Sequence, residues 1–391
     1  MENSMTISEN IIYAGVNDHE VDLFEGQYVV PLGMAYNSYV ILDEKTAVTD
    51  TVSEGFGEEW LANVKAALNG KKADYLIIHH MEPDHSSNIA LFMKEFPEAV
   101  IVSSAKAFDM MLNFYGSAFE DRRLVVKEGD TLELGSHILT FVTAPMVHWP
   151  EVIMSYESSE KVLFSADAFG KFGANDVEDP EGWACEARRY YFGIVGKFGP
   201  QVQKVLAKAS ALDIQTICPL HGPVLKEDLG YYLGIYNTWS SYQPEDKGVF
   251  IAYTSVYGHT KAAAEKLAAM LEEAGCPRVG CEDLARSDIP EDVEDAFRHD
   301  TLVLATTTYN GGIFPIMKGF IDELLERNYQ NRRIAIIENG SWAAMPEKVI
   351  KKMFESSKNI TFAENTVHIK SALSPASEAE MEALVKELVN G

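Results

Sequence analysis

The sequence predicts an α/β protein built from two unlike domains. Three observations support this. Its 391 residues exceed the roughly 150 of an average domain. A polar, proline-containing stretch at 242–247 separates a helical run from a new apolar strand. Beyond it strands and helices alternate, which is typical of a doubly wound parallel sheet, whereas short strands open the first part and then mix with helices. We therefore expect domains at residues 1–246 and 247–391.

Apolar runs and polar breaks give the elements of each domain. In the first domain we expect a helix at 89–96 and strands at 28–30, 39–42, 47–49, 75–78, 138–142, 162–165 and 214–218. In the second, strands at 249–253, 301–305 and 333–337 are each followed by a helix, at 260–273, 315–326 and 346–355, and a last helix lies near 377–389.

Composition excludes several classes of function. The 33 Lys and Arg residues against 59 Asp and Glu give 33 − 59 = −26, so nucleic acid and anionic membranes are poor partners. We see no apolar run of transmembrane length and no secretory signal at the start. Four cysteines without a Cys-x-x-Cys pair do not form a disulfide framework. We expect a cytoplasmic protein.

One loop carries the strongest chemical signal. His80, Glu82, Asp84 and His85 follow the strand at 75–78 within six residues, and we expect the residues at 86–88 to cap the helix that follows. His79 adjoins the motif, but strand alternation points it to the opposite side, so we interpret it as structural.

Three further candidate ligands also stand just after strands: His148, Asp167 and His221. If these strand ends share one edge of a sheet, seven ligands converge. Seven exceed the four of a tetrahedral zinc and suit two bridged metals. Four imidazoles and three carboxylates, without a thiolate, favour iron or manganese over a thiolate zinc site.

The second domain has three loops that suit a phosphate and a flat ring. The first joins the strand at 249–253 to a helix, where small hydroxyl residues and backbone amides hold an anion. The other two follow the strands at 301–305 and 333–337, where doubly wound sheets bind ligands. The candidate residues are Thr254, Ser255, Val256, Tyr257, Gly258, His259, Thr260, Thr306, Thr307, Thr308, Tyr309, Asn310, Gly311, Gly312, Asn339, Gly340, Ser341 and Trp342.

The metal loop resembles the His-x-His-x-Asp-His signature of the metallo-β-lactamase fold, with Glu82 at the second His. Together with His148, Asp167 and His221, that replacement resembles the flavodiiron protein family over nearly the whole chain. The resemblance implies an αββα sandwich. It also implies that His80, Glu82 and His148 hold one iron, that Asp84, His85 and His221 hold the other, and that Asp167 bridges them. Near the iron site, Tyr191 would either donate a hydrogen bond or proton, or pack.

The second domain resembles a flavodoxin, which implies bound FMN. By this resemblance the phosphate rests on residues 254–260 and the isoalloxazine lies between the other two loops. His259 replaces a residue that is commonly small or hydroxylated, so its contact stays open.

The resemblance implies an oxidoreductase that passes electrons through FMN to a di-iron centre, which reduces O2 to water or NO to N2O. It implies a separate electron donor, a rubredoxin or a reduced deazaflavin coenzyme, and a head-to-tail homodimer or a dimer of dimers. Two alternatives stay open: a binuclear zinc hydrolase fused to a flavodoxin-like module, and an electron carrier whose first domain is structural.

Overall fold

The computed structural model describes residues 5–390, and the chain divides into two compact units, one ending at Tyr236 and one starting at Asn237. The boundary expected from the sequence, between 246 and 247, lies a little later and stays a prediction. None of the helices in the described residues has both the length and the apolar character needed to cross a membrane.

The first unit contains two sheets that pack face to face. The six-stranded sheet has the order β1 (Ile11–Tyr13), β6 (Tyr39–Ile41), β7 (Ala47–Thr49), β8 (Tyr75–Ile77), β9 (Val100–Ser103) and β10 (Arg123–Val125). The five-stranded sheet has the order β11 (Thr131–Glu133), β12 (Ile138–Thr143), β13 (Ile153–Glu157), β14 (Val162–Phe164) and β15 (Thr216–Cys218). Buried apolar side chains from both sheets, such as Ile77 and Phe141, form one core between them.

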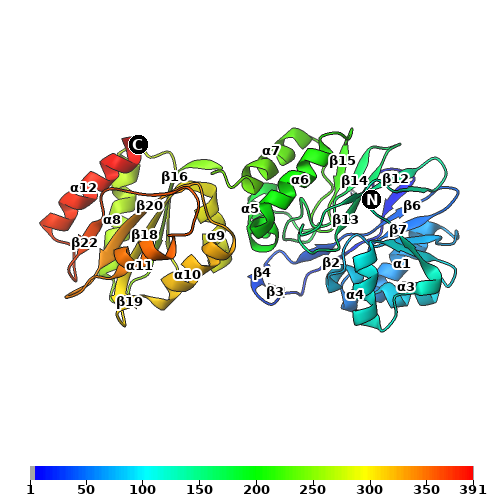
Figure 1. Ribbon diagram of the computed structural model, residues 1–391, viewed down its shortest axis with the longest axis horizontal. Helices are drawn as coiled ribbons and strands as arrows, with labels where there is room; N and C mark the ends of the chain where they lie inside the picture. The colour runs from blue at the N-terminus through cyan, green and yellow to red at the C-terminus, as the bar shows by residue number, and fades with distance from the viewer. Residues whose placement is uncertain (1–4, 391) are drawn as a thin grey trace. The chain divides into compact units, whose positions relative to one another are not determined.

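Helices cover the outer faces of this sandwich. Figure 1 shows α1 (Gly57–Leu68), α3 (Ile89–Glu95) and α4 (Ala105–Tyr115) on one side, and α6 (Gly199–Ala209) and α7 (Leu229–Ser240) on the other. In α1, Trp60, Val64 and Ala67 recur at helical spacing and are buried, and the helix ends at Asn69 in a left-handed conformation. The predicted αββα layering is confirmed.

Two small antiparallel two-stranded sheets accompany the sandwich. They pair β2 (Val16–Asp18) with β5 (Met34–Tyr36), and β3 (Leu23–Phe24) with β4 (Tyr28–Val29).

The second unit has a parallel sheet in the order β17 (Val279–Asp283), β16 (Asp246–Tyr253), β18 (His299–Tyr309) and β20 (Arg332–Asn339), and then β21 (Ile360–Phe362) and β22 (Val367–Ile369), which both pair with β20. A short β19 (Gly312–Ile313) runs antiparallel to the end of β18. Across the sheet from the β17 edge, the parallel strands are the second, first, third, fourth and fifth in the chain, which is the strand order of flavodoxins. The predicted doubly wound sheet is confirmed.

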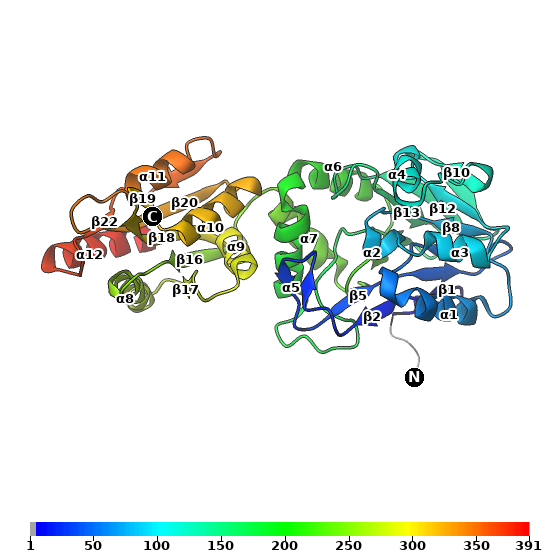
Figure 2. The same ribbon diagram turned by 90° about the horizontal axis from the view of Figure 1, so that it is seen from below.

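Helices cover both faces of this sheet. In Figure 2, α8 (His259–Glu273) and α12 (Pro375–Asn390) lie on one side, and α9 (Ile289–Arg298), α10 (Pro315–Glu326) and α11 (Pro346–Met353) on the other. The sequence patterns did not reveal β17 and α9. The residues of β17 are mostly half-buried because the strand is at the sheet edge, so no continuous apolar run marks it.

Candidate metal centre and flavin site

The metal loop begins where the buried strand β8 ends. His80 and Glu82 lie in the loop itself, and Asp84 and His85 lie on a short helix, α2 (Pro83–Ser86), which begins at a proline. Asn88 is the N-cap residue of α3, as expected, but its side chain makes no cap bond. Its Nδ2 instead donates to the carbonyls of Val52 (2.7 Å) and Ser53 (3.1 Å), which ties the loop to the segment after β7.

The remaining candidate ligands follow strands that point the same way. β12 and β14 both run antiparallel to β13, and β14 pairs with β15 in parallel, with Phe164 opposite Cys218. Asp167 and His221 therefore stand three residues beyond paired positions, and His148 follows β12 at the same edge. Strand direction thus brings three distant segments together.

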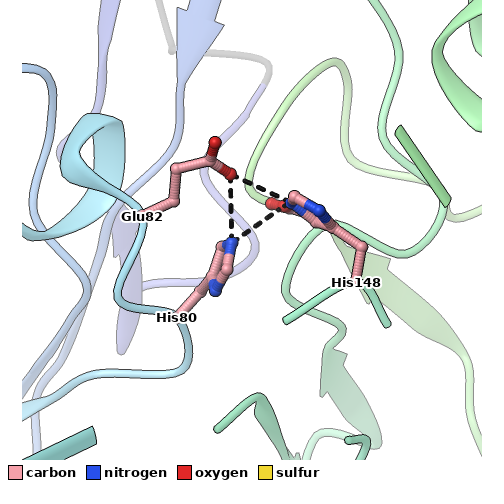
Figure 3. A group of neighbouring side chains, drawn as sticks. His80, Glu82 and His148 are labelled. Carbon is pink, nitrogen blue, oxygen red and sulfur yellow. Dashed lines mark hydrogen bonds and ion pairs between the residues drawn. The ribbon is translucent and has the colours of Figure 1, made fainter. Parts of the chain in front are cut away.

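His80, Glu82, His148 and Asp167 form the first ligand group, in which one potential ligand atom from each lies within 4.8 Å of the others. Glu82 Oε2 is 3.1 Å from His80 Nε2 and 3.0 Å from His148 Nε2. Asp167 Oδ2 is 3.3 and 3.1 Å from the same two nitrogens. Figure 3 shows the two imidazoles and the Glu82 carboxylate directed toward one point. We call this point the first metal position.

Asp84, His85 and His221 form the second ligand group. The Nε2 atoms of the two imidazoles are 2.9 Å apart, and Asp84 Oδ2 lies 3.3 Å from the first and 3.2 Å from the second. Asp167 Oδ1 approaches these nitrogens at 3.6 and 3.9 Å. We call the space between them the second metal position.

Asp167 lies between the two groups, with Oδ2 facing the first and Oδ1 facing the second. Both of its oxygens, and both of those of Asp84, are buried without a hydrogen-bond partner among the described residues. Buried polar atoms normally have partners, so four unpaired carboxylate oxygens beside four imidazoles indicate a site that binds cations. The donor set fits two metal ions with a carboxylate bridge.

The electrostatics of the groups agree with this. Burial alone would raise the pKa of the Asp167 carboxyl, but the imidazoles of His80, His148 and His85 outweigh it and hold the pKa well below its usual range. Burial opposes charge on His148, yet the nearby carboxylates of Asp167 and Glu82 raise its pKa to about 9. Without metal, a proton on His148 thus offsets part of the carboxylate charge, and metal binding displaces such a proton.

Two ligand imidazoles have their second nitrogen fixed from behind. His80 Nδ1 lies 2.8 Å from Glu151 Oε1, which also accepts from the Met81 amide at 2.9 Å. His221 Nδ1 donates to the Ala35 carbonyl at 2.7 Å. Both contacts leave Nε2 facing the centre. Sequence reasoning missed Glu151, although a carboxylate three residues after His148 was a usable signal.

His79 points away from the ligand groups, as predicted. Its Nδ1 contacts Asp50 Oδ2 at 2.5 Å, and its Nε2 contacts Ser155 Oγ at 2.8 Å. Ser, His and Asp side chains in this order also occur in hydrolases, but all three are buried here, at 1 % exposure or less, so no substrate reaches them. The three residues tie the metal loop to both sheets.

The structure places Tyr191 at the start of a π-helical segment, η3 (Tyr191–Val195), with its ring centroid 5.0 Å from that of Tyr236. The neighbouring Tyr190 is the tyrosine whose ring lies 5.5 Å from the His221 ring. A role for Tyr191 near the metals stays a prediction.

A cavity of about 320 Å³ lies against the ligand groups. Glu82 and Asp84 line it together with Phe24, Glu25, Tyr36 and Ser53. Its size and its partly apolar wall suit a small molecule that reaches the metal positions.

The first flavin-type loop has the expected geometry of an anion site. Gly258 adopts a left-handed conformation (φ 89°) just before α8, and its amide donates to Ser255 Oγ at 3.1 Å. Thr254 and Thr306 are fully buried and their hydroxyl oxygens are 2.7 Å apart, so they join two of the loops.

A cavity of about 130 Å³ lies at the carboxyl edge of this sheet. It is lined by Ser255, Val256, Tyr257, His259, Thr260, Thr307, Asn339, Ser341 and Ser371. Three large aromatic side chains from the same loops are exposed, at 90 % for Tyr257, 94 % for Trp342 and 43 % for Tyr309. Exposed aromatics around a small hydroxyl-lined cavity fit a phosphate with an attached flat ring.

The other candidate flavin residues have different places. Thr308 Oγ1 accepts from the Met345 amide and donates to the Asn339 carbonyl, so it holds the loops together. Asn310 and Gly311 have positive φ where the chain turns from β18 to β19. Sequence reasoning missed Ser371, whose Oγ lies 2.7 Å from Ser341 Oγ. It follows β22, a strand of three residues that was not expected.

Comparisons with known proteins support the expected fold of each of the two domains. Residues 34–222 match the model of the ODP family beta lactamase, and residues 250–367 match a flavodoxin domain. A nitric oxide reductase of Moorella thermoacetica is 30% identical over 372 residues, which cover 93% of this chain and 92% of that protein. The anaerobic nitric oxide reductase flavorubredoxin of Salmonella arizonae is 31% identical over 87% of this chain and 73% of its own length.

Solved structures agree over nearly the whole chain. Rubredoxin oxygen:oxidoreductase of Desulfovibrio gigas superposes with a TM-score of 0.90 at 25% identity, covering 98% of this chain and 97% of that one. The flavodiiron protein of Giardia intestinalis superposes with a TM-score of 0.89 at 25% identity, covering 98% and 94%.

Proposed function

This chain belongs to the flavodiiron protein family and is an oxidoreductase, and we propose that it passes electrons from a separate donor through FMN to a di-iron centre. There it reduces O2 to water, NO to N2O, or both. The observation that carries the proposal is the position of Asp167, whose two oxygens face two separate ligand groups. A single-metal site has no use for the second group, and a binuclear zinc hydrolase, which would use both groups, is distinguished by the metal content of the purified protein.

The roles of the side chains follow from their positions. Each metal position would receive two imidazoles and one carboxylate of its own, with Asp167 shared. Ser255, Thr260 and the amides at the start of α8 would hold the FMN phosphate, and Tyr309 and Trp342 would flank the ring. When bound, the flavin takes up electrons singly or in pairs and releases them singly, and the irons bind and reduce the oxidant.

The chain itself would control access and geometry. Phe24 and Tyr36 form part of the wall of the cavity at the metal positions, whose volume of about 320 Å³ has ample room for a diatomic molecule. Glu151 and the Ala35 carbonyl hold two ligand rings in place, so the groups keep their positions while the oxidant reacts.

The choice between O2 and NO is tested by anaerobic turnover of the reduced holoprotein with each oxidant in turn. The name of the Moorella relative supports NO and that of the Desulfovibrio relative supports O2. We expect oxidant-dependent reoxidation of the flavin, with N2O formed from NO or with no peroxide released from O2. Flavin that stays reduced with both oxidants contradicts the proposal.

We propose that the electron donor is a separate rubredoxin, with a reduced deazaflavin coenzyme as the alternative. The chain has neither a Cys-x-x-Cys pair nor a Gly-x-Gly-x-x-Gly motif, and the names of two of the similar proteins include rubredoxin. Reduction of the bound flavin by one donor and not by the other decides between them, and direct reduction by NAD(P)H contradicts both.

We also propose a cytoplasmic location. Recovery of the protein in the membrane or secreted fraction of its source cells contradicts that proposal.

We propose that two chains form a head-to-tail homodimer, alone or within a dimer of dimers, in which the FMN of one chain faces the irons of the other. Co-expression of His148→Ala chains, which lack the first metal position, with Gly258→Glu chains, which lack the flavin, tests this. Random pairing makes about half of the dimers mixed, each with one intact FMN facing one intact metal centre. Activity should therefore return to about a quarter of the wild-type value. Purified mixed dimers without turnover contradict the crossed arrangement.

A further inference from the structure

Glu151 is a buried carboxylate directly behind the ligand His80. The residue is 2 % exposed, and its Oε1 accepts from both His80 Nδ1 (2.8 Å) and the Met81 amide (2.9 Å). Its Oε2 has no hydrogen-bond partner among residues 5–390. Its backbone carbonyl accepts from Ser104 Oγ at 2.8 Å, which fixes the residue from the other side. The only ion pair found for Glu151 in the part of the chain described is with His80.

At the second metal position, no carboxylate among residues 5–390 accepts from the Nδ1 of either imidazole. His221 Nδ1 donates to a neutral backbone carbonyl, that of Ala35. His85 Nδ1 is buried without a hydrogen-bond partner in the described part of the chain. The two ligand groups are thus alike in their direct ligands and differ in what lies behind the imidazoles.

From this difference we infer that Glu151 is a positioning residue that strengthens metal binding at the first metal position, so that the two positions differ in affinity. The inference rests on the proposed function only in that both ligand groups bind metal. A carboxylate that accepts from Nδ1 fixes the tautomer with its free electron pair on Nε2, and it raises the basicity of the ring.

A metal ion bound to the other side of the His80 imidazole would also balance the negative charge of Glu151. A buried carboxylate without a cationic partner is costly, and no lysine or arginine pairs with Glu151 within residues 5–390. A metal at His80 Nε2 supplies the missing positive charge across the imidazole. Loss of such a partner typically lowers metal affinity about 10- to 100-fold.

The test is a chelator competition on the full-length protein loaded anaerobically with Fe²⁺, in which the iron retained per chain is counted at rising chelator concentration. Glu151→Gln keeps the size of the side chain and one acceptor oxygen but removes the charge. We expect one of its two irons to be lost at about 10- to 100-fold lower chelator concentration than in the wild type, and the other to be unchanged. Glu151→Asp, which keeps the charge, should retain this iron better than Glu151→Gln does.

A second pair of variants assigns the weakened position. In a His221→Ala background, which cripples the second position, Glu151→Gln should lower the affinity for the remaining iron by the same factor. In a His148→Ala background it should have no effect. A loss confined to the His148→Ala background would overturn the assignment.

Glu157→Gln is the matched control. Glu157 ends β13 and is fully buried, but its carboxylate binds the amides of Ser159 (2.8 Å) and Glu160 (2.7 Å) and contacts no ligand. It therefore measures the general cost of neutralising a buried glutamate in this unit, and it should keep both irons at wild-type affinity. If Glu151→Gln behaves like Glu157→Gln while the wild type binds two irons, the inference is wrong and the proposed function stands. A wild type that binds no iron overturns both.

Discussion

We expect His148→Ala to lose the proposed reduction of the oxidant and to keep FMN bound. The substitution removes the nitrogen that lies 3.0 Å from Glu82 Oε2 and 3.1 Å from Asp167 Oδ2, so the first metal position keeps only three of its four ligands. We expect turnover to fall by at least about 100-fold, because loss of a direct ligand exceeds the 10- to 100-fold effect of losing a residue that only orients one. Iron and flavin per chain, with turnover, are the measurements.

The flavin should survive because its candidate residues belong to the other compact unit. His137→Ala is the matched control. His137 is also a buried imidazole of the first unit, paired with Asp43 (2.8 Å) and Glu160 (3.2 Å), and it lies outside both ligand groups. We expect it to keep iron and turnover. Wild-type turnover in His148→Ala contradicts the assignment of this ligand.

We expect Gly258→Glu to lose FMN and to keep its iron. Gly258 immediately precedes α8, and a Cβ atom built there meets no neighbour within 4 Å, so the new side chain has room to place its carboxylate in the loop. That anion would repel the phosphate that we expect at residues 254–260. Electron entry would then stop, and donor-driven turnover should fall to background.

Gly258→Ala separates charge from backbone strain in this test. Its φ of 89° disfavours any side chain, so alanine carries the same conformational cost, about 1–2 kcal/mol, without the carboxylate. The alanine variant should keep most of its flavin. Equal flavin loss in both variants would show that strain, and not the position of the phosphate, explains the result.

The sequence predicts that the seven candidate ligands lie close together because all seven follow strand ends, and strand ends can be recognised from apolar runs. It also predicts the parallel sheet of the second unit, since β16, β18 and β20 are buried almost throughout. The sequence alone does not give the distances between candidate ligands that lie far apart in the chain. Only the pairing of Phe164 with Cys218 shows that Asp167 and His221 share one sheet edge.

The sequence did not reveal several residues that support the two sites, and the physical reasons differ from one residue to the next. The Ala35 carbonyl behind His221 could not be predicted, since every residue has a carbonyl. Ser371 follows a three-residue strand, Val367–Ile369, whose middle residue is a half-exposed histidine. No apolar run therefore marks this strand in the sequence. Asp50, the partner of His79, did follow an expected strand, and its position just past that strand was a signal that could have been used.

We propose that one chain binds both a di-iron centre and a flavin, and the metal and flavin content of the protein, purified anaerobically from cells grown without added metal, tests this. We expect about two irons and one FMN per chain, in line with the two ligand groups and the three flavin-type loops. Stoichiometric zinc without iron would contradict it and would favour the hydrolase alternative.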